Sequence, residues 1–265
     1  MSHPLLERLR SPDPDERCAA CRDVGEDPAA ILLVDGLVGA LGDPVMAVAQ
    51  AATDALVKLG QDHEVIPSLR AALRDGDAMR RLDAALALAR LEPPHVRLVP
   101  ALVDGLGLAD AKRRWWATRL LVETGRLATE VLPVLLGLSR DAEQPAVRRM
   151  ARHALRELAR DDPEAACALV EATRDPDVPA RRAGYAALAA VLAPEPAVVV
   201  CLTEALGSEP DAACRRIATV ALAELASRDA SVIDAAARQA LETARASRDE
   251  GLQRGAERAL AVLER

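Results

Sequence analysis

Residues 175–188 read DPDVPARRAGYAAL: an acidic turn, a pair of arginines, and then small and apolar residues at helical spacing. With Arg181 as the anchor, the small residue Gly184 follows three positions later and Leu188 follows seven positions later. Offsets of three and seven fall on one face of a helix. Aspartate in the preceding turn suits the N-cap of that helix. The stretch therefore predicts a helix that begins after the turn and buries one stripe.

The same pattern recurs through the chain with a period of about 33 residues. Its anchors are Arg17, Ala49, Arg81, Arg114, Arg148, Arg181, Arg215 and Gln253. A small residue stands three positions after every anchor, and a leucine or valine stands seven after it. A shorter helix precedes each anchor helix, and Pro67 and Pro100 lie in the first turn of two of these, where proline is tolerated. We predict one domain, a right-handed all-α solenoid of about eight hairpins, approximately 1–27, 28–61, 62–93, 94–127, 128–161, 162–194, 195–229 and 230–265.

The two ends depart from this pattern. The first hairpin has Asp23, Gly25 and Asp27 where apolar residues are expected, and the last has Gln253 at its anchor. Terminal repeats face water on one side, so atypical residues are expected there.

Composition agrees with helices. The chain has no Phe, one Tyr and two Trp, so Ala, Leu and Val must fill its interior. Small and unbranched side chains favour helices over strands. A net charge of −7 argues against a protein that coats nucleic acid, because that task requires neutralised phosphates over a broad surface.

The turn aspartates, the anchor arginines and the proline-marked first helices make the chain similar to the HEAT-repeat family. The bacterial members grouped with bilin-lyase repeats resemble it especially. The resemblance covers essentially the whole chain. It implies that the second helices line a concave surface, and it is more specific for the fold than for the function.

The anchor arginines predict a structural ladder. Arg81 follows Asp75 and Asp77, and Arg181 follows Asp175 and Asp177. Pairs between turn acids and helix arginines, repeated along the stack, would tie the hairpins together, at about 0–1 kcal/mol for each partly exposed pair. The predicted ladder comprises Arg81, Arg114, Arg148, Arg181 and Arg215.

A second group of residues predicts a binding surface. All three aromatic residues fall in second helices of the central repeats, and further basic residues fall around them. By the resemblance they face the groove, and aromatic residues and arginine are typical of interaction hot spots. The predicted patch comprises Trp115, Trp116, Arg119, Arg149, Arg152, His153, Arg156, Arg182, Tyr185 and Arg216. The alternative is that one tryptophan fills the core and that the arginines form a solvated face.

Catalytic and metal-binding motifs are not found. Cys18 and Cys21 have the spacing of half a zinc site, but no second pair follows, so both are interpreted as small core residues. Cys167 and Cys201 share the register of the first helices and are expected in the core. The histidines His3, His63, His95 and His153 share no ligand spacing, and no nucleophile elbow or phosphate-binding loop occurs. We expect no enzyme, metal or cofactor.

The N-terminus lacks an apolar signal region, and no stretch approaches the ~18 apolar residues of a membrane span. We expect a cytoplasmic protein with no membrane partner. The leading hypothesis is an interaction scaffold or adaptor that binds an acidic segment of a protein partner in its groove. One alternative is nucleic-acid binding, since alkylpurine DNA glycosylases are HEAT-like and use Trp, Arg and an acid, although neither Asp110 nor Glu123 matches that acid. A second is a bilin-lyase-like or chaperone subunit.

Overall fold

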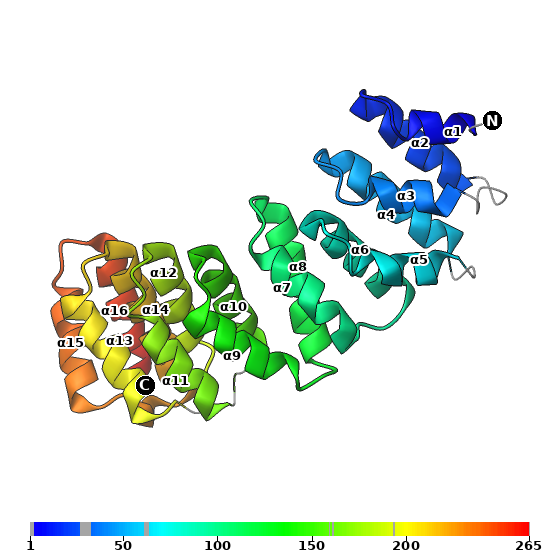
Figure 1. Ribbon diagram of the computed structural model, residues 1–265. Helices are drawn as coiled ribbons and strands as arrows, with labels where there is room; N and C mark the ends of the chain where they lie inside the picture. Colours follow the sequence, from blue (N-terminus) through cyan, green and yellow to red (C-terminus); the bar gives the residue numbers. More distant parts are fainter. Residues whose placement is uncertain are drawn as a thin grey trace. The chain divides into compact units, whose positions relative to one another are not determined.

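The computed structural model describes residues 3–26, 33–60, 64–158, 160, 162–192 and 194–264. Within these ranges the chain forms sixteen α-helices and no strand (Figure 1). The helices alternate along the chain as eight hairpins, so the predicted all-α solenoid is confirmed. Asp27 and His63 lie outside the described residues.

The first compact unit comprises Met1–Val131 and holds four hairpins. Within it the second helices pack in series, α2 against α4, α4 against α6 and α6 against α8. A 3-10 turn, Val96–Leu98, leads into the last hairpin. The helices are α1 (Pro4–Arg8), α2 (Pro14–Glu26), α3 (Val34–Ala40), α4 (Met46–Leu59), α5 (Val65–Ala72), α6 (Ala78–Leu91), α7 (Val99–Leu106) and α8 (Ala111–Gly125).

The second compact unit comprises Leu132–Arg265, and its boundary falls at the start of the fifth hairpin. Here α10 packs against α12, α12 against α14 and α14 against α16. The helices are α9 (Val131–Asp141), α10 (Pro145–Leu158), α11 (Pro163–Ala172), α12 (Val178–Leu188), α13 (Pro196–Ser208), α14 (Ala212–Arg228), α15 (Ala235–Arg245) and α16 (Glu250–Leu263). A continuous array through both units stays a prediction.

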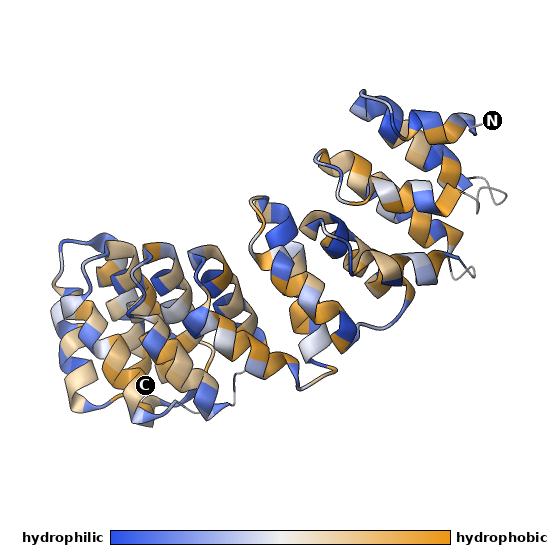
Figure 2. Cartoon of the chain, viewed as in Figure 1, coloured by the Kyte–Doolittle hydropathy of each residue, from blue (hydrophilic) through white to orange (hydrophobic). Residues whose placement is uncertain are grey.

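Aspartate caps start most of the second helices. The side chain of Asp177 accepts a hydrogen bond from the Ala180 N–H at 2.8 Å, and Asp110 accepts one from the Arg113 N–H at 2.7 Å. Such a cap contributes about 1 kcal/mol. Figure 2 shows apolar residues along the helices and hydrophilic residues at many turns. The acidic turns recognised in the sequence therefore set where the helices begin.

The predicted core stripe is confirmed in both units. The small residues three positions after the anchors are buried, as are the residues seven positions after them. Gly25 is also buried. A Cβ at this position would lie 2.9 Å from the Cα of Ala55, so the glycine lets α2 approach α4 closely. Gly25, one of the atypical residues of the first hairpin, thus lies in the core at a position where the pattern has an apolar residue. The expectation that Cys167 is a core residue is wrong, because its side chain is exposed.

Candidate functional site

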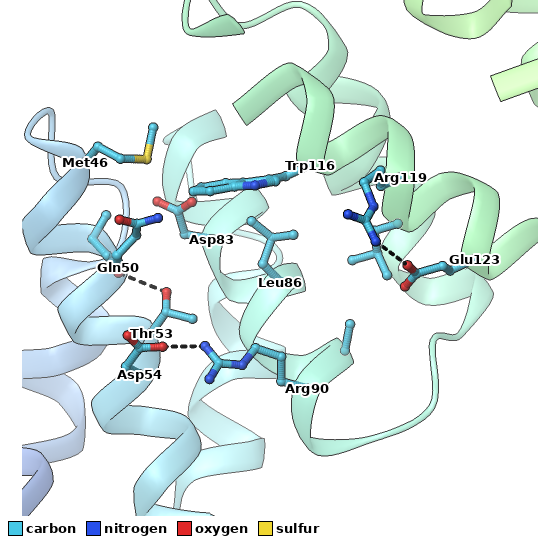
Figure 3. Close-up of a pocket in the computed structure, with 13 residues that line it drawn as sticks. Met46, Gln50, Thr53, Asp54, Asp83, Leu86, Arg90, Trp116, Arg119 and Glu123 are labelled. Atoms are coloured by element: carbon cyan, nitrogen blue, oxygen red, sulfur yellow. Dashed lines mark hydrogen bonds and ion pairs between the residues drawn. The ribbon is translucent and has the colours of Figure 1, made fainter. Parts of the chain in front are cut away.

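Three second helices of the first unit, α4, α6 and α8, surround a cavity of about 540 Å³ (Figure 3). We call it the Trp116 pocket. Its apolar lining includes Met46, Leu86, Trp116 and Leu120, and its charged lining comprises Asp54, Asp83, Arg90, Arg119 and Glu123. A cavity of this size, with apolar walls and a few polar groups, is typical of a ligand-binding site.

Most charges in the Trp116 pocket are paired with one another. Arg90 Nη1 lies 2.5 Å from Asp54 Oδ1, and Arg119 Nη2 lies 3.7 Å from Glu123 Oε1. All four side chains are largely exposed, so each pair contributes only about 0–1 kcal/mol to stability. A ligand can therefore rearrange these pairs at low cost.

Asp83 is the buried charge of the pocket, with 3% of the residue exposed. Its Oδ2 accepts hydrogen bonds from Arg113 Nη2 at 3.1 Å and from the Gly42 N–H at 3.0 Å. Arg113, itself buried, also donates to the Asp43 carbonyl at 3.0 Å. Burial raises the pKa of Asp83, and the positive charge of Arg113 opposes that rise. Asp83 and Arg113 were not among the predicted site residues, although a carboxylate two positions after the anchor Arg81, among buried alanines, requires a partner.

The two tryptophans have different positions. Trp115 is 52% exposed and does not line the pocket. Trp116 is partly buried and lines the pocket, and Lys112 Nζ lies 5.0 Å from the centroid of its ring. Of the predicted patch residues, Trp116 and Arg119 are therefore the two that the structure brings together at this pocket.

In the second unit, α10 carries a basic face formed by Arg149, His153 and Arg156. These positions lie four and three residues apart, so they share one side of the helix. Within the described part of the chain, no carboxylate forms an ion pair with Arg149 or Arg156. Burial, followed by the charges of Arg149 and Arg156, lowers the pKa of His153. We call these three residues the α10 basic face.

Arg152 and Tyr185 do not lie on a surface. Arg152 Nη2 donates to the Ser139 carbonyl at 2.7 Å and contacts Asp175 Oδ2 at 2.8 Å. The Tyr185 hydroxyl donates to Glu209 Oε2 at 3.2 Å. Both side chains occupy inward positions of their helices and are buried. Their burial corrects the expectation that they line the binding surface.

Arg182 and Arg216 join successive hairpins. Arg182 Nη2 lies 2.9 Å from Asp211 Oδ2, and Arg216 Nε lies 2.8 Å from Asp249 Oδ1. Asp211 is the N-cap of α14 and Asp249 is the N-cap of α16. Each aspartate therefore pairs with an arginine of the preceding hairpin and also accepts hydrogen bonds from N–H groups of its own helix. Among the predicted arginines one position after an anchor, Arg149 differs, because no described residue is such a partner for it.

The anchor arginines also bond across hairpin junctions. Arg148 Nη1 donates to the Ala142 carbonyl of its own turn at 2.7 Å, and its Nε donates to Asp175 Oδ2 of the next hairpin at 2.6 Å. Ion pairs to the following hairpin also join Arg17 to Asp43, Arg81 to Asp104 and Arg181 to Glu209. The sequence predicted that each anchor arginine pairs with an acid of its own turn. In the structure the acid belongs to the next hairpin, and the arginine's own turn supplies backbone carbonyl oxygens as hydrogen-bond acceptors. Arg114 and Arg215 bond only carbonyl oxygens among the described residues.

Asp175 gives a pH-dependent prediction. Burial would raise its pKa, but hydrogen bonds from Arg148, the Asp177 N–H and Arg152 outweigh burial and lower the pKa to about 2. Because the folded pKa lies below the ordinary value of about 3.9, ionised Asp175 stabilises the fold above that value. This contribution, on the order of 2 kcal/mol, is lost as the pH falls towards 2.

Asp175→Asn is therefore expected to be less stable than the wild type at pH 7, with a difference that shrinks between about pH 5 and pH 2. Urea unfolding of both proteins across this range measures the difference. Other carboxylates titrate in both proteins and cancel. A difference that stays constant down to pH 2 would contradict the role given to Asp175.

A model of HEAT repeats matches residues 2–89 and 99–189, more than half of the chain. The chain belongs to the HEAT-repeat family. The predicted resemblance is thus confirmed, and HEAT repeats form a scaffold suited to protein interaction. No curated protein matches this HEAT-repeat protein.

Solved structures share its fold. Kap95p, in a structure in which it binds RanGDP, is 14% identical with a TM-score of 0.64, over 98% of this chain and 39% of that one. A Kap121p mutant is 14% identical with a TM-score of 0.56, over 98% of this chain and 37% of that one. An engineered protein is 24% identical with a TM-score of 0.49, over 98% of this chain and 78% of that one. The HEAT-repeat chain thus spans less than two fifths of Kap95p and Kap121p, and these similarities concern the fold alone.

Across the described ranges, no group of three or more His, Cys, Asp or Glu side chains is arranged to hold a metal ion. None of the helices in those same ranges combines the length and apolar character needed to cross a bilayer.

Proposed function

We propose that this HEAT-repeat protein is a non-enzymatic scaffold that binds an acidic segment of a partner protein on its α10 basic face. The observation that carries the proposal is the unpaired state of Arg149 and Arg156 within the described part of the chain. Elsewhere in the second unit, Arg148, Arg182 and Arg216 each bond an acid of the next hairpin. Two charges on one helix face that no described carboxylate pairs with can attract a carboxylate-bearing partner.

The spacing of the α10 basic face suits an extended or helical acidic segment. Arg149 and Arg156 are seven residues apart, which is about 10 Å along the helix axis. Acidic residues at a similar separation in a partner can contact both guanidinium groups. Arg156 is exposed and Arg149 is half-buried, so salt can screen these contacts and we expect the affinity to fall as salt concentration rises.

Nucleic acid is the alternative anionic partner. Its affinity rests on many phosphate contacts. The α10 basic face offers few, and the whole chain carries a net charge of −7. An acidic protein segment requires only two or three such contacts, so the protein partner is favoured.

The test replaces Arg149 and Arg156 by glutamate in one double variant. We expect this change to weaken binding of a labelled helical peptide, with Glu at positions i, i+4 and i+7, by at least about tenfold. Fluorescence anisotropy at several salt concentrations measures the affinity. The matched control is Arg238→Glu with Arg248→Glu, which makes the same charge change at exposed positions outside α10.

Equal loss in both double variants would show that net charge alone matters and would contradict the proposal. Pull-downs with the same three proteins connect the peptide result to native partners, since a true partner is lost only from the α10 variant. A DNA duplex that binds more tightly than the peptide, and that the α10 variant loses, would assign the face to nucleic acid.

A further inference from the structure

The Trp116 pocket contains a carboxylate oxygen, Oδ1 of Asp83, that no described residue hydrogen-bonds. Both hydrogen bonds to Asp83 reach its Oδ2, while its Oδ1 accepts none from a described residue. Oδ1 is not among the buried polar atoms that lack a partner, and Asp83 lines the pocket, so Oδ1 is accessible from it. A carboxylate can accept several hydrogen bonds. Asp83 can therefore take a donor from a ligand without releasing Arg113.

The remaining charges of the pocket do not compete for this oxygen. Arg90 pairs with Asp54, and Arg119 pairs with Glu123. Figure 3 draws both pairs apart from the Asp83 carboxylate, and Asp83 and Trp116 line the same pocket. The ring of Trp116 already attracts one cation, since Lys112 Nζ lies 5.0 Å from its centroid, and an accessible anionic oxygen in the same pocket suits a second one.

The walls of the pocket fit the rest of a long basic side chain. Leu86 and Leu120 line it together with Trp116. Arginine buries its aliphatic stem along apolar surfaces and stacks its planar, weakly hydrated guanidinium on aromatic rings. Lysine has a more strongly hydrated head and no plane to stack.

We propose that the Trp116 pocket binds an arginine side chain of a partner protein, with the guanidinium on Asp83 Oδ1 and the Trp116 ring. This site is separate from the α10 basic face and has the opposite charge preference. The aliphatic stem of the arginine contacts Leu86 and Leu120.

The binding test uses the capped tripeptide Ac-Ala-Arg-Ala-NH2 and two matched peptides with Gln or Glu in place of Arg. The indole N–H resonance of Trp116 in a ¹⁵N-labelled sample is the readout, assigned by its loss in Trp116→Leu. We expect saturable shifts with the Arg peptide, at least about tenfold weaker binding of the Gln peptide, and none of the Glu peptide. Trp115→Leu should leave the Arg affinity unchanged, because Trp115 does not line the pocket.

Two sets of variants test the contact itself. The double variant D83N/R113M removes both buried charges while keeping a side-chain oxygen for the Gly42 N–H, and it should weaken the Arg peptide by about tenfold. Leu86→Lys places a cation in the pocket and should also weaken binding, whereas Leu86→Glu should strengthen it. The Leu86 pair keeps the test valid even if the double variant does not fold.

Several outcomes would overturn the proposal. They are equal binding of the Arg and Gln peptides, no shift of the Trp116 resonance at about 50 mM peptide, and equal effects of the two Leu86 variants. A thymidine octanucleotide that shifts this resonance at lower concentration than the Arg peptide would assign the ring to nucleobases instead. The α10 double variant should bind the Arg peptide normally, so failure of either proposal leaves the other testable.

Discussion

Replacing Arg113 by alanine is expected to lower the free energy of unfolding by about 3–5 kcal/mol. The change leaves the buried Asp83 carboxylate without its positive partner, and the Gly42 N–H remains as its hydrogen-bond donor. Burial already raises the pKa of Asp83 against the opposing charge of Arg113. Without that charge the pKa rises further, so the variant should lose stability as the pH increases. Urea unfolding at pH 5 and pH 8 measures both effects.

Arg114→Ala is the matched control for Arg113→Ala. Arg114 is the next residue on the same helix, and its guanidinium bonds the carbonyl oxygens of Leu108 and Ala109 near the surface. We expect its loss to cost about 1 kcal/mol. If Arg113→Ala costs no more than Arg114→Ala, the buried ion pair does not have the structural role given to it.

Gly42→Ala is expected to destabilise the first unit by about 2–5 kcal/mol, from two separate causes. Gly42 has a φ of 77°, in the left-handed region, where a Cβ costs about 1–2 kcal/mol. That Cβ would also lie 2.7 Å from the Arg80 backbone nitrogen, so the backbone must move. The movement would disturb the Gly42 hydrogen bond to Asp83 as well. Thermal and urea unfolding measure the loss.

Gly60→Ala separates the two causes. Gly60 has the same φ of 77°, with a ψ of −143°, and among the described residues a Cβ there meets the Lys58 carbonyl oxygen at an ordinary 3.8 Å. This variant should therefore show the cost of a positive φ without a steric clash. Equal losses at the two glycines would contradict a steric role for the contact with Arg80.

The helical register could be predicted from the sequence because every hairpin repeats the same physical requirement. A small residue at one offset and a leucine at another must recur wherever one second helix packs on the next. Eight copies of that requirement distinguish the pattern from chance, even where Ala49 or Gln253 replaces the anchor arginine. The aspartate caps were likewise predictable, because an N-cap depends on local sequence.

The buried pair was not predictable by the same reasoning. Asp83 and Arg113 are 30 residues apart and meet only because α6 and α8 stack. Neighbouring residues on a helix differ by about 100° in direction. Arg113 is therefore buried while Arg114 reaches its own turn, and Trp115 is exposed while Trp116 lines the pocket.

The binding residues were only partly predictable for a related reason. The predicted arginines one position after an anchor, Arg149, Arg182 and Arg216, differ in whether they bond the next hairpin. The choice depends on whether an acid of the next hairpin lies within reach. Arg182 has Asp211 within reach, whereas Arg149 forms no such pair among the described residues. Composition and spacing do not reveal that difference.

The anchor arginines also bear on how such a chain can lengthen by gene duplication. Arg148 bonds a carbonyl oxygen of its own turn and a carboxylate of the next hairpin, so its two bonds together need groups from two hairpins. A duplicated hairpin contains an arginine that can bond the following hairpin and an acid that can bond the arginine of the preceding hairpin. The ion pairs on both sides of the new hairpin can therefore form at once. A duplication that began in mid-hairpin would separate these halves. The bonding scheme thus favours growth and loss in whole hairpins.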